Sequence, residues 1–228
     1  MPWVKNQQSC FWYNTHLNTL TGEWLIHFMT DRNYGDFSVK ERRKKLYAKI
    51  GLDYSKIISG SQVHGSKVMF VNGKVDKDDL ENTDGLVVTA DESAGIVVYT
   101  ADCAPVWIVD TVKRVVGLVH SGKEGTKKGI VVTGIDLMTE KCGCKKQNMA
   151  VIIGPHIQSC CYPYDIETNI VQQAETNGIT KNNIYRSGLC TSCNNASFYS
   201  YRKEKGVTGR MASVAYIKQG AKYGTWKI

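Results

Sequence analysis

Short apolar runs bounded by Gly, Asp or Asn dominate the middle of the chain. Because they are rich in Val and Ile, they predict strands at 68–71, 85–89, 95–100, 106–109, 115–119 and 149–153, and a last strand at 210–217. Several runs are apolar throughout and do not alternate with polar residues. Strands of that kind are covered on both faces, so we predict a sheet that is buried on both sides.

Apolar residues at intervals of three and four predict helices between these strands. The first is expected over 38–50, where Ser38 and Glu41 have the spacing of a capping box. Two further helices are expected, one beginning after Thr126 and one running over 165–177. Sheets covered by helices predict an α+β or α/β domain with a mixed sheet. Since no repeat or Pro/Ser-rich linker interrupts the pattern, we expect a single domain over 1–228.

The charge of the chain favours anionic ligands. Its 228 residues include 29 basic and 21 acidic ones, which gives a formal net charge of +8. Phosphates and nucleic acids are the anions that such a balance suits. The densest basic run, from Lys40 to Lys49, is typical of a solvated helix face. No RNA- or DNA-binding signature is visible, so we do not expect nucleic acid as a partner.

No N-terminal stretch resembles a secretory signal, and no apolar run approaches the roughly 18 residues that a membrane span needs. We therefore expect a soluble, cytoplasmic protein that has no membrane partner. Eight cysteines in such a protein are expected to be thiols or metal ligands and not a disulfide framework.

Three separated segments each carry a soft metal ligand: Gln62-Val63-His64-Gly65, Thr100-Ala101-Asp102-Cys103-Ala104-Pro105 and Val119-His120-Ser121-Gly122. One thiolate and two imidazoles would hold zinc and leave its fourth position open, which is typical of catalytic sites. His64, Cys103 and His120 are therefore candidate metal ligands and catalytic residues; the alternative is that each serves packing or a local hydrogen bond, as single His and Cys residues more often do. Asp102, beside Cys103, is a candidate to orient a ligand or to accept a proton.

The remaining cysteines suggest a second, structural site. Cys190 and Cys193 form a Cys-x-x-Cys pair, and Cys142 and Cys144 could supply two more thiolates to one zinc. A bond between the adjacent Cys160 and Cys161 would be strained, so these two are interpreted as free thiols.

The order of these and other segments resembles the laccase-domain proteins, also labelled polyphenol oxidases and regarded as zinc-dependent purine nucleoside enzymes. The resemblance extends from about Ile26 to Val214. Besides the three ligand segments it rests on His27-Phe28-Met29-Thr30-Asp31-Arg32, Asp84-Gly85-Leu86-Val87-Val88-Thr89, Gly154-Pro155-His156-Ile157, Cys160-Cys161-Tyr162, Phe198-Tyr199-Ser200-Tyr201-Arg202 and Gly209-Arg210.

The resemblance implies a compact α+β domain, with a mixed β-sheet sandwich flanked by helices, that holds Zn²⁺ on His64, Cys103 and His120. It also implies phosphorolysis of adenosine, inosine, guanosine or methylthioadenosine, and deamination of adenosine. The expected partners are a small-molecule nucleoside and phosphate, with the protein a monomer or a homodimer. The candidate residues for binding substrate and phosphate are Arg43, Gln62, Lys123, Lys127 and Arg202.

The chain departs from the family pattern after the third ligand. The family has His-Ala-Gly-Trp-Arg-Gly there, whereas this chain has Lys123 and Glu124 in place of Trp and Arg. If that Arg binds phosphate, the Glu124 carboxylate opposes the role, and Lys123 or Lys127 would have to replace it. The expected Asn-Arg pair of the first helix is Arg42-Arg43, and Pro163 follows Cys-Cys-Tyr where the family has Glu. These differences bear on phosphate binding more than on zinc binding.

Three alternatives concern the chemistry. A multicopper laccase needs about ten histidines, and the chain has five, which excludes that activity but leaves copper as an adventitious occupant of the zinc site. A metal-free cysteine hydrolase would use Cys103 as nucleophile and His120 or His64 as base, on amide or cell-wall peptide substrates. A binding protein without catalytic activity is the third alternative, because the Lys123-Glu124 loop is altered.

Overall fold

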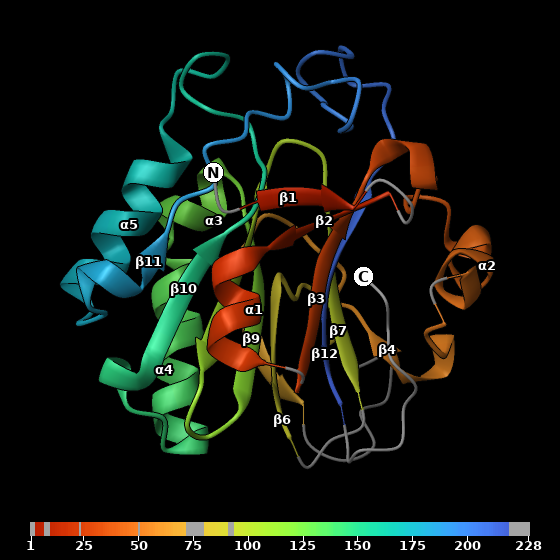
Figure 1. Cartoon of the computed structure of the whole chain (residues 1–228). Helices are drawn as coiled ribbons and strands as arrows, with labels where there is room; N and C mark the ends of the chain where they lie inside the picture. The colour runs from red at the N-terminus through yellow and green to blue at the C-terminus, as the bar shows by residue number, and fades with distance from the viewer. Residues whose placement is uncertain are drawn as a thin grey trace.

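The computed structural model describes residues 3–6, 10–22, 24–49, 51–71, 80–90 and 94–218. Two six-stranded mixed sheets pack against each other, and helices cover their outer faces (Figure 1). This confirms the α+β fold and the mixed β-sandwich in a single compact domain.

The first sheet has the strand order β1-β2-β3-β12-β7-β4. Neighbouring strands are antiparallel except β4, which runs parallel to β7. The strands are β1 (Trp3–Asn6), β2 (Phe11–Asn14), β3 (Leu25–Thr30), β12 (Met211–Ile217), β7 (Gly95–Thr100) and β4 (Ile57–Ile58). Helix α1 (Thr15–Thr21) connects β2 to β3.

The second sheet has the order β11-β10-β8-β9-β6-β5. Its two outer pairs are parallel and its inner pairs antiparallel. The strands are β11 (Ile184–Tyr185), β10 (Met149–Ile153), β8 (Ala104–Asp110), β9 (Val115–Ser121), β6 (Gly85–Thr89) and β5 (Val68–Val71). The central strand β8 is buried along its whole length.

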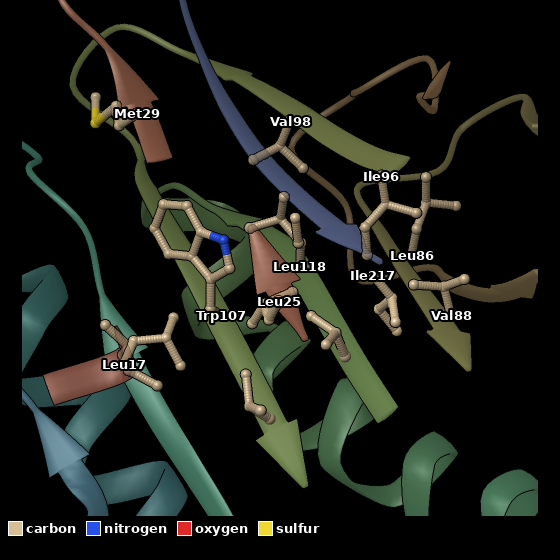
Figure 2. Close-up of a cluster of buried hydrophobic side chains, with 14 of the residues drawn as sticks. Leu17, Leu25, Met29, Leu86, Val88, Ile96, Val98, Trp107, Leu118 and Ile217 are labelled. Atoms are coloured by element: carbon tan, nitrogen blue, oxygen red, sulfur yellow. The ribbon is translucent and has the colours of Figure 1, made fainter. Parts of the chain in front are cut away.

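Strand β8 shows why its sequence does not alternate between apolar and polar residues. Successive side chains of a strand point to opposite faces. Trp107 and Val109 enter the core between the two sheets, whereas Val106 and Ile108 enter the core beneath the helices. The Trp107 indole packs among residues of both sheets (Figure 2), and its Nε1 donates to the carbonyl of Val214 at 3.0 Å. Both faces of the strand therefore require apolar residues, as predicted.

Helices α4 (Ile130–Cys142) and α5 (Ile166–Thr176), with the short α3 (Lys123–Lys127), cover the second sheet. Helix α2 (Lys40–Lys49) covers the first sheet on the opposite side of the molecule (Figure 1), where Leu46 and Tyr47 pack on Phe28. The 3₁₀ turns that lie wholly within the described residues are Arg32–Tyr34, Tyr54–Lys56, Lys146–Asn148 and Lys181–Asn183.

The helix expected over 38–50 begins two residues later, at Lys40. The Ser38 hydroxyl donates to Asp36 Oδ2 at 2.8 Å, so its hydrogen bond serves the preceding turn. Ile50, the last residue of the expected helix, lies outside the described residues. Along the part of the chain that the structure describes, no helix has the length and apolar character needed to cross a bilayer.

Candidate functional site

The three predicted ligands lie on three different connections of the sandwich. His64 lies in the loop between β4 and β5, Cys103 in the turn between β7 and β8, and His120 near the end of β9. Because β8 pairs with β9 so that Pro105 faces His120, the turn at Cys103 is held beside the imidazole. The ligand atoms of His64, Cys103 and His120 all lie within 4.8 Å of one another. The structure therefore brings the predicted triad together.

Asp84, immediately before β6, connects two of these ligands. Its Oδ1 lies 2.9 Å from Nδ1 of His120. A carboxylate only accepts, so Nδ1 carries the proton and Nε2 is the nitrogen available to a metal. The same carboxylate accepts the backbone N–H groups of Val63, His64 and Gly65 at 2.8 to 3.1 Å. Asp84 therefore fixes both the ring of His120 and the loop that carries His64.

The backbone is unusual at two positions of the site. His64 has φ +59° and Asp102 has φ +86°, conformations that residues with a side chain rarely adopt. The three hydrogen bonds from the Val63–Gly65 loop to Asp84 hold the first of these turns. Backbone strain of this kind is concentrated at functional sites.

Gly122 leaves the space that Cys103 occupies. A Cβ at this position would lie 2.6 Å from Sγ of Cys103 and 3.2 Å from Cδ2 of His64. Any side chain there would displace the thiol. Glycine is therefore required at position 122 because it leaves room for Cys103, and not because it makes the backbone flexible.

The charges of the triad favour a thiolate. Burial by itself raises the pKa of the Cys103 thiol, but the charge of His120 and hydrogen bonds from His120 and His64 outweigh it and lower this pKa to about 6. Burial likewise opposes protonation of His120, yet the Cys103 thiolate and Asp84 raise the pKa of the imidazole to about 9. The protein alone therefore presents a thiolate beside an imidazolium at neutral pH.

The donor set fits a divalent metal ion. Sulfur and imidazole nitrogen are the donors that zinc prefers, at about 2.3 Å and 2.0–2.1 Å. A carboxylate on the far nitrogen of a histidine ligand, as Asp84 is on His120, is the usual support for such a ligand. Three protein donors leave a position for water or substrate.

The triad lies in a cavity of about 1010 Å³. Its cationic lining residues are Lys40, Arg43, Lys123, Arg202 and Arg210, its acidic ones are Asp102 and Glu124, and its tyrosines are Tyr54, Tyr99, Tyr162 and Tyr201. The cavity is therefore positive and partly aromatic, and its volume reaches the upper end of the range for small-molecule sites, about 300–1,000 Å³.

Three of these cations are held in place by neighbouring groups, beginning with Arg43. Its Nε donates to the carbonyl of Phe37 at 2.8 Å, and its guanidinium lies 3.9 Å from the centre of the Tyr99 ring. Arg202 lies over Tyr162 at 5.3 Å, and Arg210 donates to the carbonyls of Thr208 and Gly209. Stacking on tyrosine holds a guanidinium in place while its edge remains able to bind an anion.

Three other residues that were predicted for this site, Asp102, Gln62 and Lys127, have different positions and contacts. The Asp102 carboxylate accepts from the Thr191 hydroxyl at 2.6 Å and from the backbone N–H of Arg202 at 2.7 Å, so it orients the cavity wall. Both amide atoms of Gln62 bond to the backbone of Tyr99, which ties its loop to β7. Lys127 does not line the cavity; its Nζ lies 3.6 Å from Glu124.

Asp84, Lys40 and Arg210 also belong to this site, and the sequence did not predict them as site residues. Asp84 and Arg210 both occur in the segments that carry the family resemblance, but their contacts across the fold were not visible there. A carboxylate placed directly before a buried strand, as Asp84 is before β6, was the one signal available.

The hypothesis that joined Cys142 and Cys144 to Cys190 and Cys193 is wrong. Among the described residues, which include every cysteine, the second set of potential metal ligands is Cys160, Cys161, Cys190 and Cys193. Cys142 ends helix α4. Burial raises the pKa of the Cys144 thiol, and the nearby Asp110 carboxylate raises it further, to about 12. Cys160 and Cys161 are reduced, as interpreted, but they are not isolated thiols.

Comparison with known proteins gives a consistent result. The family model described as "Multi-copper polyphenol oxidoreductase laccase" matches residues 30–169 and 163–218. The chain is 28% identical over 220 residues to purine nucleoside phosphorylase YlmD of Bacillus subtilis, covering 81% of this chain and 79% of that protein. It is 32% identical over 178 residues to a purine nucleoside phosphorylase of Clostridium acetobutylicum, covering 67% and 73%.

Solved structures share the fold. The crystal structure of YlmD from Geobacillus stearothermophilus superposes with a TM-score of 0.83 at 22% identity, covering 96% of this chain and 99% of that one. A hypothetical protein YfiH from Bacillus licheniformis gives the same TM-score at 24% identity, with 95% and 99% covered.

Proposed function

The chain belongs to the multi-copper polyphenol oxidoreductase laccase family, and from that premise we propose that it is a zinc-dependent enzyme that cleaves purine nucleosides with phosphate. Relatives that carry the name purine nucleoside phosphorylase support the substrate class. The observation that carries the proposal is the convergence of His64, Cys103 and His120 in a large, positively charged cavity.

In this proposal His64, Cys103 and His120 hold Zn²⁺, and Asp84 holds the His120 ring in the orientation that exposes Nε2. The bound metal would supply a Lewis acid within the cavity. Because the pKa of Cys103 is already lowered to about 6, the thiolate needed for metal binding forms at neutral pH.

The cations of the cavity would bind phosphate. Phosphorolysis joins a phosphate oxygen to the anomeric carbon of the ribose, while the electrons of the glycosidic bond leave with the base. The guanidinium groups of Arg43 and Arg202 lie over tyrosine rings, and Arg43 also donates to a backbone carbonyl. They would therefore position a dianion at little cost in side-chain entropy. The tyrosines of the cavity give the purine aromatic faces on which to stack.

Deamination of adenosine is a second reaction that we propose for the same site. It needs water and not phosphate, so it makes no demand on the altered Lys123-Glu124 segment. Multicopper chemistry does not fit the ligand supply. Of the five histidines, His16 stacks on Tyr185, His27 contacts Asn14 and His156 contacts Gly154, which leaves only His64 and His120 at this site.

A cysteine hydrolase remains a second candidate, because one observation favours it. Cys103, His120 and Asp84 form a thiolate, an imidazolium and an orienting carboxylate in series. That arrangement is the one used by cysteine nucleophiles without a metal.

One experiment separates the two candidates. Protein purified under reducing conditions is assayed for zinc content, then for release of purine base and of ammonia from a panel of nucleosides with and without phosphate. We expect phosphate-dependent base release from wild type. Cys103→Ala should lose this activity and contain one zinc fewer per chain than wild type, whereas Cys142→Ala should match wild type in both. Equal zinc content in wild type and Cys103→Ala, together with hydrolysis of amides that requires Cys103, would support the hydrolase instead. Wild type as inactive on nucleosides as Cys103→Ala would refute the nucleoside activity.

A further inference from the structure

A second cluster of soft ligands lies outside the triad. Cys160 and Cys161 belong to the loop between β10 and α5, and Cys190 and Cys193 to the segment between β11 and β12. In Figure 1 these two connections rise at the same end of the molecule, and an isolated β-bridge between His156 and Cys190 joins them. All four sulfur atoms lie within 4.8 Å of one another.

The distances between these sulfurs match a single tetrahedral ion. Sγ of Cys193 lies 3.6 Å from that of Cys160 and 3.4 Å from that of Cys161, and the last two are 3.8 Å apart. Four sulfurs at about 2.3 Å from a tetrahedral zinc are separated by about 3.8 Å. Iron–sulfur clusters require cysteines placed around several metal atoms, so a set this compact suits one ion.

We propose that Cys160, Cys161, Cys190 and Cys193 bind one structural Zn²⁺ through four thiolates. Nothing in the proposed nucleoside activity requires this ion. The backbone N–H of Gln158 points at Sγ of Cys190 with N···S 3.4 Å, a contact that stabilises a coordinated thiolate. Four protein ligands close the coordination sphere, which is the mark of a structural site and distinguishes it from the three-ligand triad.

The position of this cluster gives the ion a role in shaping the cavity. Thr191 lies between two of the ligands, and its hydroxyl donates to the Asp102 carboxylate, next to Cys103. Tyr162 follows Cys161 directly and lines the cavity, where the guanidinium of Arg202 lies over its ring. One ion would therefore bind together the two loops that form this wall and fix them to the turn that carries Cys103.

The test separates the two metal sites by variant. Cys103→Ala removes a triad ligand, so zinc that remains in this variant after dialysis belongs to the four-cysteine cluster. Cys160→Ser/Cys193→Ser removes the two exposed ligands of the cluster, and Cys142→Ser is the matched control outside both sites. Circular dichroism checks that each variant is folded.

We expect Cys103→Ala to retain one zinc per chain and the double variant to lose that ion, while Cys142→Ser matches the wild type. Cobalt provides a readout independent of activity, because charge-transfer absorption grows with the number of thiolate ligands. Co²⁺-loaded Cys103→Ala should keep strong absorption of this kind, and the double variant should lose most of it. Hydrogen exchange in 157–162 and 190–202 should be faster in the double variant.

Three results would overturn the proposal. The first is Cys103→Ala without stoichiometric zinc and without thiolate-to-cobalt absorption. The second is a disulfide between any two of these cysteines in protein prepared under reducing conditions. The third is stoichiometric iron in place of zinc. Each leaves the test of nucleoside cleavage unaffected, because that test depends on the triad.

Discussion

Oδ1 of Asp84 lies 2.9 Å from Nδ1 of His120, and the carbonyl of Asp84 accepts the backbone N–H of the same histidine at 2.7 Å. The Asp84 carboxylate also accepts three backbone N–H groups from the loop that carries His64. One residue therefore positions two imidazoles far apart in the sequence, one in the loop before β5 and one near the end of β9. These hydrogen bonds from His120 and from the backbone N–H groups outweigh burial and lower the pKa of Asp84, so it is a carboxylate at neutral pH.

Asp84→Asn should weaken metal binding at the triad. The amide is neutral, so it no longer supports the charge on His120, and it cannot satisfy all the contacts that the carboxylate makes. Loss of such a supporting carboxylate typically costs about 10–100-fold in metal affinity. Competition with a chromophoric chelator measures the change, and Asp136→Asn on the half-exposed face of α4 is the control. Equal affinities for wild type and Asp84→Asn would contradict the role given to this residue.

Gly122→Ala should remove metal from the triad without unfolding the protein. The added Cβ would lie 2.6 Å from Sγ of Cys103, so the thiol must move out of ligand geometry. Gly22→Ala is a suitable control, because its Cβ meets open space although its φ is +57°. The control should lose about 1–3 kcal/mol of stability, because φ +57° with ψ −130° is a conformation that alanine rarely adopts, and it should keep its metal. Retention of zinc by Gly122→Ala would show that the site tolerates a larger displacement than these contacts allow.

Glu124→Gln should strengthen phosphate binding. The Glu124 carboxylate lies in the cavity where the cationic groups would bind phosphate, and Lys127, 3.6 Å away, offsets it only in part because both side chains are about half exposed. Removing one partly solvated negative charge should make the free energy of phosphate binding more favourable by about 0.5–1 kcal/mol. The KM for phosphate should therefore fall about two- to five-fold. Glu140→Gln, on the exposed side of α4, should leave KM unchanged. A rise in KM for Glu124→Gln would mean that the carboxylate assists binding.

His27→Gln should flatten the dependence of stability on pH below neutrality. Burial, which outweighs the hydrogen bond to Asn14, lowers the pKa of His27 from 6.5 to about 4. The unfolded chain therefore binds a proton below pH 6.5 that the folded chain does not take up until about pH 4. The free energy of unfolding should fall across that window by about 3 kcal/mol from this group alone.

Urea unfolding at several pH values measures this slope. The slope between pH 6.5 and 4 should be smaller in His27→Gln than in wild type, whereas His16→Gln, which replaces an exposed histidine, should keep the wild-type slope. Parallel curves for wild type and His27→Gln would mean that the buried imidazole takes up its proton in the folded state.

The sequence determined strands β5 to β10, strand β12 and helices α4 and α5. Apolar runs such as β8 must be buried on both faces. The spacing of Val131, Ile135 and Met138 places them on one face of helix α4, and that face packs into the core. Helix α1 and strands β3, β4 and β11 were not predicted, and neither were the N-terminal strands β1 and β2. Their residues mix aromatic and polar side chains over only a few positions, and pairing with β3 decides their conformation.

The triad could be predicted because its ligands occur in segments with a recognisable order. The tertiary structure alone decided which residues support it and which cysteines meet. Asp84 reaches His120 and the His64 loop only when β6 pairs with β9. Cys160 and Cys161 meet Cys190 and Cys193 because two loops are joined at one end of the sandwich, whereas Cys142 ends a helix elsewhere. The spacing of residues along the chain predicts contacts within one helix or strand. Contacts between loops depend instead on how the sheets arrange the strand ends that the loops connect.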